Sequence, residues 1–89
     1  MRICAITERT PERLAELLAV WERSVRATHT FLTEGEILRI RDYVPQALAA
    51  VPELAGLEEG GRIVGFLGAG EGRLEMLFLD PEIRGQGLG

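Results

Sequence analysis

The chain ends in the stretch that decides its fold, Leu77-Phe78-Leu79-Asp80-Pro81-Glu82-Ile83-Arg84-Gly85-Gln86-Gly87-Leu88-Gly89. This stretch begins as a β-strand and continues as a loop that contains three glycines. Because glycine has no Cβ and adopts positive φ readily, several main-chain N–H groups of such a loop can approach one anion. The usual partner of such a loop is the N-terminus of a following helix, and the sequence stops before that helix. We therefore expect a phosphate-binding loop at the end of an incomplete fold.

Length and composition indicate one small globular domain over residues 1–89. Hydrophobic residues make up 46% of the chain and charged residues 27%, a balance that excludes a disordered tail or a fibrous repeat. The net charge of −4 excludes a broad basic surface for nucleic acid. The sequence has neither a signal-peptide-like run nor the about 20 consecutive apolar residues of a membrane span. We therefore expect no nucleic-acid partner and no membrane partner.

The cysteine and histidine content bears on disulfides and metals. Cys4 is the single cysteine, so the chain can form no internal disulfide, and this thiol usage is typical of a cytoplasmic protein. One histidine and scattered carboxylates form no cluster of metal ligands. We expect a cytoplasmic protein that uses no metal.

Hydrophobic periodicity predicts a strand followed by a helix. The short apolar run Arg2 to Thr7 is typical of an opening strand. From Pro11 to Ala27 apolar residues recur at helical spacing, and charged residues fall between them. Thr10 can cap this helix, and proline suits its first turn. An amphipathic helix is therefore expected to follow the first strand.

A second helix is predicted to begin after Thr33 and to end before Pro52. Thr33 and Glu36 have the spacing of a capping box, in which each side chain accepts a hydrogen bond from the main-chain N–H of the other residue. The apolar residues of this helix keep one phase through Pro45. Because an interior proline costs about 3 kcal/mol in an unbroken helix, we expect a kink or two short helices here.

The rest of the chain predicts three antiparallel strands in meander order. Leu54 to Glu59 and Arg62 to Gly68 are joined by Gly60-Gly61, which suits a tight β-hairpin turn. A second turn at Gly70 to Gly72 leads into the last strand, Arg73 to Leu79. The predicted fold class is α+β, with one strand, two helices and a three-stranded meander that ends in the glycine-rich loop.

Two common glycine-rich nucleotide sites do not fit this loop. A P-loop needs a lysine and a hydroxyl residue after its glycines, and neither follows Gly85. A dinucleotide-binding fingerprint needs G-x-G-x-x-G early in a βαβ unit, whereas Gly85 to Gly89 is G-x-G-x-G after antiparallel strands. An ordinary mobile C-terminal tail stays open as an alternative to a phosphate site.

A third pattern does fit the loop. Arg84 to Gly89 matches Q/R-x-x-G-x-G/A, which is the hallmark of the GNAT superfamily of acyl-CoA-dependent N-acetyltransferases. The preceding Leu77 to Pro81 and the order of the predicted elements also resemble this family. Trp21 to Leu32 resembles a group of small bacterial acetyltransferases of the superfamily. The resemblance covers the whole chain and implies a truncated, layered α/β domain of GNAT type, in which the C-terminal half of the fold is absent.

The resemblance implies an N-acetyltransferase, in which a primary amine attacks the thioester carbonyl of acetyl-CoA. The acceptor would be a small molecule or a peptide. Main-chain groups of the last strand would bind the pantetheine arm like an added strand, and N–H groups of the loop would bind the pyrophosphate. The implied coenzyme-binding residues are Leu77, Leu79, Arg84, Gly85, Gln86, Gly87, Leu88 and Gly89. We expect the side chains of Leu77 and Leu79 themselves to face the core.

The same resemblance implies a role in the reaction or in acceptor binding for two further residues, Glu75 and His29. Glu75 alternates with Leu74 and Met76 on the last strand, where related enzymes often place a carboxylate that accepts the proton of the amine. The alternative for Glu75 is a solvated carboxylate on the outer face of the sheet. His29 lies beyond the first predicted helix, in the region that lines the acceptor pocket of related enzymes, and its alternative is a cap or a loop contact.

Because the C-terminal half of the GNAT-type fold is absent from the sequence, a second function that is not enzymatic is also considered. The absent part of the fold usually supplies a tyrosine general acid and half of the coenzyme cleft, so whether the 89 residues act as an enzyme is open. The chain would then be a catalytically incomplete, oligomerising or coenzyme-binding remnant. Since unpaired strand edges recruit other chains, we expect a homo-oligomer through the exposed last strand, Arg73 to Leu79.

Overall fold

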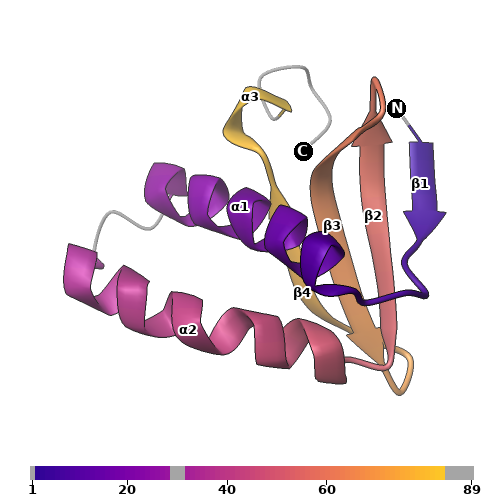
Figure 1. The fold of residues 1–89 in the computed structure, drawn as a ribbon, viewed down its shortest axis with the longest axis horizontal. Coiled ribbons are helices and arrows are strands. Elements are labelled where there is room, and N and C mark those ends of the chain that lie inside the picture. The colour runs from indigo at the N-terminus through magenta and orange to yellow at the C-terminus, as the bar shows by residue number, and fades with distance from the viewer. Residues whose placement is uncertain (1, 29–31, 84–89) are drawn as a thin grey trace.

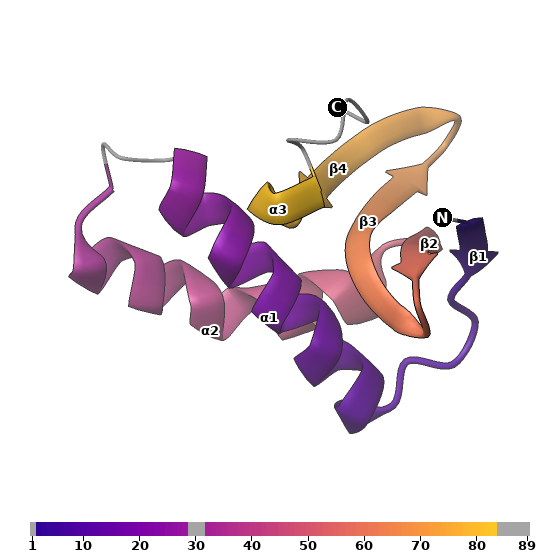
Figure 2. The same cartoon turned by 90° about the horizontal axis from the view of Figure 1, so that it is seen from above.

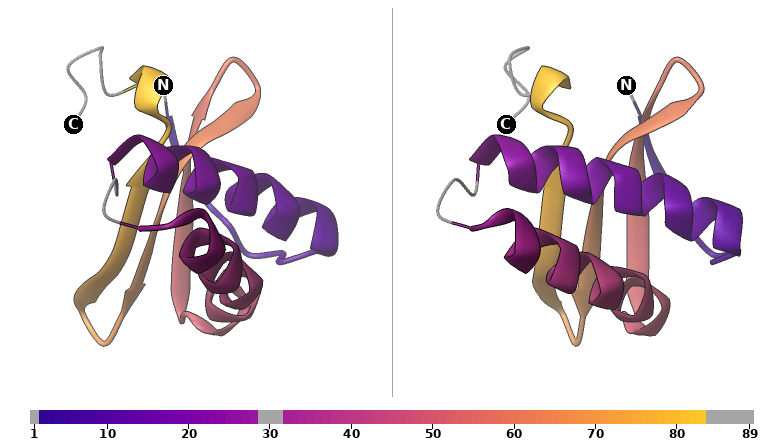
Figure 3. Two further views of the ribbon diagram at one scale, coloured as in Figure 1. Left: turned by 90° about the vertical axis from the view of Figure 1, so that its left-hand side faces the viewer. Right: turned by 60° about the vertical axis from the view of Figure 1, so that its left-hand side comes forward.

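The computed structural model describes residues 2–28 and 32–83. The elements follow in the order β1 (Arg2–Ala5), α1 (Pro11–Thr28), α2 (Glu34–Ala50), β2 (Glu53–Glu59), β3 (Arg62–Gly70), β4 (Arg73–Leu79) and α3 (Pro81–Ile83). The four strands form one antiparallel sheet in the order β1-β2-β3-β4 (Figure 1). Both long helices lie on the same side of this sheet (Figure 3). The predicted order of strand, two helices and meander is therefore confirmed.

Side-chain caps begin both long helices, as the sequence predicts. The Thr10 hydroxyl accepts a hydrogen bond from the main-chain N–H of Arg13 at 3.1 Å, which satisfies a donor in the first turn of α1. At the start of α2, the Glu36 N–H donates to the Thr33 hydroxyl at 3.2 Å, and the Thr33 N–H donates to the Glu36 carboxylate at 2.9 Å. The capping box is therefore complete.

Helix α2 continues through its interior proline. Pro45 lies inside one helix that extends from Glu34 to Ala50, so the expectation of two short helices is wrong. Ile37, Val44 and Leu48 keep a single helical phase across the proline, and all three are buried. Burial of this continuous face outweighs the about 3 kcal/mol that an interior proline costs.

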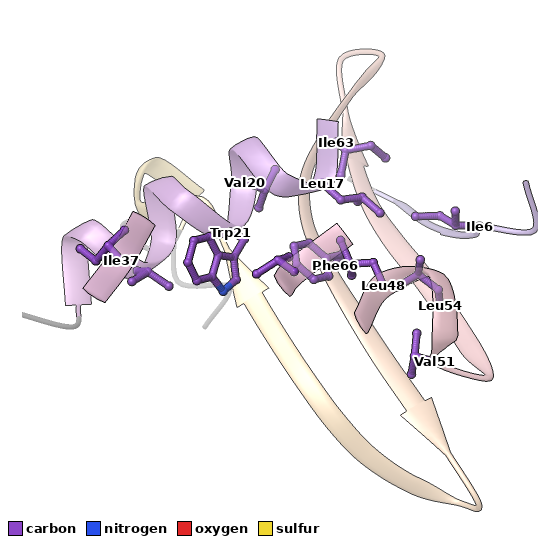
Figure 4. Close-up of a cluster of buried hydrophobic side chains, with 12 residues drawn as sticks. Ile6, Leu17, Val20, Trp21, Ile37, Leu48, Val51, Leu54, Ile63 and Phe66 are labelled. Carbon is purple, nitrogen blue, oxygen red and sulfur yellow. The ribbon is translucent and has the colours of Figure 1, made fainter. Parts of the chain in front are cut away.

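The core lies between the helices and the inner face of the sheet (Figure 4). Its centre is Phe66 on β3, whose side chain is 0% exposed. Phe66 pairs with Phe78 of β4, and their ring centroids are 5.5 Å apart. The buried members of this cluster are Ile6, Leu17, Val20, Trp21, Val25, Ile37, Val44, Leu48, Val51, Leu54, Ile63 and Phe66.

Two tight turns connect the meander. Gly60 and Gly61 have φ of 60° and 83°, and Glu71 and Gly72 have φ of 54° and 74°. Positive φ at both central residues is the geometry of the hairpin turn that suits the twist of antiparallel strands. The first of these turns is the one that the Gly-Gly pair predicts.

An extra residue in β4 changes which side chains reach the core. Gly68 pairs with Met76 and Ala69 pairs with Leu74, so Glu75 has no Cα partner on β3. Such a bulge reverses the alternation of side chains beyond it. Leu74 therefore faces away from the core and is 61% exposed. Strict alternation along the strand would instead place its side chain on the same inner face of the sheet as that of Met76.

Arg9 ties the loop before α1 to the end of α2. Its guanidinium donates to the carbonyl of Leu48 at 3.0 Å, to that of Ala49 at 3.1 Å, and also to that of Val51. A fourth bond reaches Pro52 at 3.3 Å. The last carbonyls of a helix have no partner within it, and a cation suits the negative end of the helix dipole. Arg9 is therefore the C-terminal cap of α2, from a distant part of the chain.

Replacement of Arg9 by alanine is expected to lower the free energy of unfolding by about 1–2 kcal/mol, because several helix-end carbonyls lose a charged donor. Urea denaturation followed by circular dichroism measures this loss. The matched control is Arg2→Ala, which removes one exposed ion pair with Glu58 and should change stability by less than about 0.5 kcal/mol. Equal effects of the two variants would contradict the capping role.

Candidate functional site

The candidate site is the side of β4 that faces away from β3, since β4 is the last strand in the sheet order of the described residues. Asp80, directly after β4, donates its N–H to the carbonyl of Val64 at 2.8 Å. Main-chain groups alternate in direction along a strand, so those of Phe78 also point toward β3. The N–H and C=O groups of Leu77 and Leu79 consequently point outward from the edge of the sheet. These are the two residues that the sequence predicts to meet a ligand through their main chain.

The side chains of Leu77 and Leu79 do not lie where the sequence suggests. Leu77 pairs with Leu67 on the outer face of the sheet and is 50% exposed, so the expectation that it faces the core is wrong. Leu79 also lies outside the core cluster, and its Cδ2 is 2.7 Å from the position of a Cβ built on Gly65. Because Phe78 pairs with Phe66 on the inner face, its two neighbours must point to the other face.

Glu75 lies in the bulge of β4, two residues before Leu77. Its side chain is exposed, and its Oε2 is 3.2 Å from a Cβ built on Gly70 at the end of β3. The structure thus gives Glu75 the solvated position that the sequence allows as the alternative. A role in taking a proton stays a prediction.

An apolar cavity of about 220 Å³ lies beside β4 on the helix side of the sheet. Met76 and Phe78, whose side chains flank the position of Leu77, form its wall on β4. It is lined by Trp21, Val44, Ala47, Leu48, Phe66, Met76 and Phe78. None of these lining residues is charged, so the cavity suits an apolar group.

Asp80 is a site residue that the sequence reasoning missed. It is only 2% exposed, and its Oδ2 accepts a hydrogen bond from Nε of Arg23 on α1 at 2.8 Å. Its Oδ1 accepts from the N–H of Glu82 at 3.1 Å, and its carbonyl accepts from the N–H of Ile83 at 3.0 Å. Figures 1 and 2 show α3 beside α1, where this ion pair joins them. An aspartate directly before a proline is a helix-start signal that could have indicated the cap.

The electrostatic surroundings keep Asp80 ionised. Burial raises the pKa of its carboxyl group, but the hydrogen bond from the Glu82 N–H and the guanidinium of Arg23 lower the pKa. Arg62 on β3 adds a smaller lowering. The net pKa lies below the ordinary value of 3.8, so Asp80 is a buried carboxylate at neutral pH.

A second group of charges joins the two helices on the surface. Arg26 holds both carboxylate oxygens of Glu34, at 2.6 Å and 2.7 Å, and also bonds Glu22 at 2.9 Å. Arg41 of α2 bonds the other oxygen of Glu22 at 3.1 Å. Hydrogen bonds from Arg41 and Arg26 lower the pKa of Glu22. Because these groups are partly exposed, each pair stabilises the fold only slightly.

Several predicted site residues lie outside the described part of the chain. They are His29 and the loop residues Arg84, Gly85, Gln86, Gly87, Leu88 and Gly89. Within residues 2–28 and 32–83, no group of three or more histidine, cysteine, aspartate or glutamate side chains could hold a metal ion. No helix in the same described residues is long and apolar enough to cross a membrane.

The Asp80 carboxylate makes stability depend on pH in a defined direction. Since its pKa is lower in the folded state than the ordinary 3.8, its contribution is present above pH 3.8 and is lost as the pH falls through the folded pKa. Asp80→Asn is expected to lower the free energy of unfolding by about 1–3 kcal/mol at pH 7. The difference from the unaltered chain should shrink below pH 3.8 in denaturant titrations. A difference that is the same at pH 7 and pH 3 would contradict this assignment.

Comparison with known proteins relates this geometry to a family. No protein-family model matches the sequence. The chain is 35% identical over 74 residues to the peptidyl-lysine N-acetyltransferase YjaB of Salmonella typhimurium, which covers 83% of this chain and 51% of that protein. It is 34% identical over 87 residues to YjaB of Escherichia coli, which covers 98% of this chain and 59% of that protein.

Solved structures agree with the sequence relatives. The solution structure of apo-form YjaB from Escherichia coli matches 99% of this chain and 58% of its own, with a TM-score of 0.80 and 35% identity. An aminoglycoside 6′-N-acetyltransferase complexed with coenzyme A shares the fold over 100% of this chain and 49% of its own, with a TM-score of 0.61 and 14% identity. The chain spans about half the length of the curated relatives that it matches. In sequence and fold, the chain is therefore GNAT-like and corresponds to about half of an N-acetyltransferase of this kind.

Proposed function

We propose that the protein is an N-acetyltransferase that transfers an acetyl group from acetyl-CoA to a primary amine, and that β4 of this chain holds the coenzyme. The observation that carries the proposal is the direction of the main chain at Leu77, away from β3 and out of the sheet edge. The pantetheine arm of coenzyme A contains amides and can pair with such an edge as a peptide strand does. A coenzyme A complex of a protein with this fold supports the choice of ligand.

The glycine-rich loop completes the coenzyme site in this proposal. Arg84 to Gly89 follow α3 directly in the sequence. Their main-chain N–H groups would bind the pyrophosphate, since glycines allow close approach of the backbone to an anion.

The reaction forms one bond and breaks one bond at the thioester carbon. The neutral amine attacks the carbonyl carbon, the new C–N bond forms, and the C–S bond breaks to release the coenzyme A thiolate. The amine loses one proton, which Glu75 would accept directly or through water. In this proposal β4 orients the thioester through its main chain.

A peptidyl lysine is the acceptor that the relatives favour, because the YjaB proteins are named peptidyl-lysine N-acetyltransferases. A small-molecule amine is the other class. His29 would lie on the acceptor side of the site, as the resemblance implies. We place the protein in the cytoplasm, which the single free cysteine supports.

Calorimetric titration with acetyl-CoA tests the proposal. Binding is expected for the chain, whereas Gly87→Val should reduce affinity at least about tenfold, because a branched side chain would occupy the space of the phosphates. Gly35→Val is the matched control, since a Cβ at Gly35 in α2 meets nothing within 4 Å. Absence of heat with the unaltered chain and with a version extended to the length of its relatives would exclude the coenzyme claim. Unchanged affinity in Gly87→Val would exclude the role of the loop.

A second candidate function is assembly with a second copy of the chain, which the outer face of the sheet favours. On this face Leu74 and Leu77 of β4 are 61% and 50% exposed, and Ile3 of β1, at the other edge of the sheet, is 68% exposed. Exposed apolar surface on the outer face of a sheet is typical of a site of association.

Light scattering tests assembly directly. A homo-oligomer is expected at micromolar concentration, and Leu77→Lys should shift it toward monomer by placing a charge on the shared face. A stable monomer over the whole concentration range would exclude this candidate. Turnover of acetyl-CoA with a panel of amines would show that the chain is not an inactive remnant.

A further inference from the structure

The apolar cavity beside β4 is larger than an acetyl group needs. Its volume is about 220 Å³, whereas a cavity of about 150 Å³ that is lined by apolar side chains already holds a benzene ring. By proportion, the cavity has room for about six to nine carbon atoms. The acetyl group has only two, so it would leave most of this space unfilled.

The cavity opens between α2 and β4. Its inner wall consists of buried side chains from α1, α2 and β3, which are Trp21, Val44, Leu48 and Phe66. The other lining residues are more accessible: Ala47 of α2 is exposed, and Met76 and Phe78 of β4 are partly exposed. The accessible residues mark the mouth of the cavity, which therefore lies at β4.

This mouth lies beside the main chain of Leu77, to which the proposed function assigns the pantetheine arm. Leu77 lies between Met76 and Phe78, whose side chains pack against the core on the helix side of the sheet. A ligand that pairs with a strand edge lies about 4.8 Å from it, as a neighbouring strand does. An acyl chain that turns from there toward the helices would enter the cavity past Met76 and Phe78.

The lining of the cavity fits an uncharged chain better than an amine. None of the lining residues is charged. The amine of a lysine acceptor is protonated in water before it reacts, and burial of a charge without a partner is costly. An acyl chain carries no charge, and its affinity rises about fourfold for each methylene group that it buries.

We propose that this cavity binds the acyl chain of the donor, so that the protein uses acyl-CoA thioesters of about four to nine carbon atoms besides acetyl-CoA. The inference rests on the proposed function. The balance of the reaction is unchanged. The C–N bond to the amine forms at the thioester carbon, the C–S bond breaks, coenzyme A leaves as the thiolate, and the amine releases one proton.

Calorimetric titration of the 89-residue chain with acetyl-CoA, butyryl-CoA, octanoyl-CoA and dodecanoyl-CoA measures the effect of chain length on affinity. Butyryl-CoA is expected to bind about tenfold more tightly than acetyl-CoA, because it buries two more methylene groups, and octanoyl-CoA more tightly again. Dodecanoyl-CoA should bind no more tightly than octanoyl-CoA, since its chain exceeds the cavity. An affinity that keeps rising to dodecanoyl-CoA would indicate nonspecific apolar binding and would overturn the proposal.

Ala47→Phe tests the position of the acyl chain. Ala47 is exposed at the mouth of the cavity, so a larger side chain there can cover the mouth without rearranging the core. This variant is expected to abolish the gain from octanoyl-CoA and to keep the affinity for coenzyme A itself within about twofold. Ala49→Phe is the matched control, because Ala49 is another exposed alanine of α2 and does not line the cavity. An unchanged gain in Ala47→Phe would overturn the proposal.

The remaining outcomes separate this inference from the proposed function. Equal affinities for all the thioesters would overturn the acyl site while the proposed function stands. The same holds if a lysine peptide alone shifts the NMR signals of Ala47 and Met76, or if Ala47→Phe disrupts a homo-oligomer, because the cavity would then hold an acceptor or a second copy. Absence of binding of every thioester to the unaltered chain would overturn the inference, and absence also in a version extended to the length of its relatives would overturn the proposed function.

Discussion

The hydrogen-bonded register of β4 on β3 is the constraint on which the rest of the structure depends. Phe66 is completely buried and pairs with Phe78, whose ring contributes to the same core. A slip of one residue would turn Phe78 to the outer face and bring Leu77 inward. Core packing therefore fixes the register, and the register in turn aims the main-chain groups of Leu77 and Leu79 out of the sheet edge.

On β4, side chains and main chain therefore have different functions: side chains form part of the core, and main-chain groups face outward from the sheet edge. Met76 and Phe78 pack against the helices, while the main-chain groups of Leu77, which lies between them, point out of the sheet edge. In the proposed function, a ligand that pairs with this edge would thus be bound by main-chain groups, without a binding contact from a side chain of β4. Asp80 follows this strand directly, and its ion pair with Arg23 links the end of the strand to α1.

Local patterns predicted the elements well, because caps, turns and helical phase are encoded within a few residues. Thr10, the Thr33–Glu36 capping box and the Gly60–Gly61 turn all appear as expected. Which side chains of β4 face the core could not be predicted, since nothing in the alternation of Leu74 to Leu79 reveals the bulge at Glu75. A kink or two short helices were expected at Pro45 from propensity, and of these two alternatives burial of the apolar face of α2 overrides the second, since α2 continues as one helix.

The contacts that organise the candidate site were beyond the reach of local reasoning. Arg9 reaches carbonyls about forty residues away in sequence, and Arg23 reaches Asp80 across 57. Such pairs depend on how α1 and α2 pack on the sheet, which no short pattern specifies. The roles of His29 and of Arg84 to Gly89 lie outside the described residues and stay predictions from the family resemblance.

The most direct test of the account is a map of backbone amide shifts in the chain on addition of coenzyme A. If the β4 edge holds the coenzyme, the largest changes are expected at the amides of Leu77 and Leu79 and in the segment from Arg84 to Gly89, with little change on β1 and β2. Shifts confined to the far edge of the sheet, or no shifts at saturating ligand, would contradict the claim that the β4 edge holds the coenzyme.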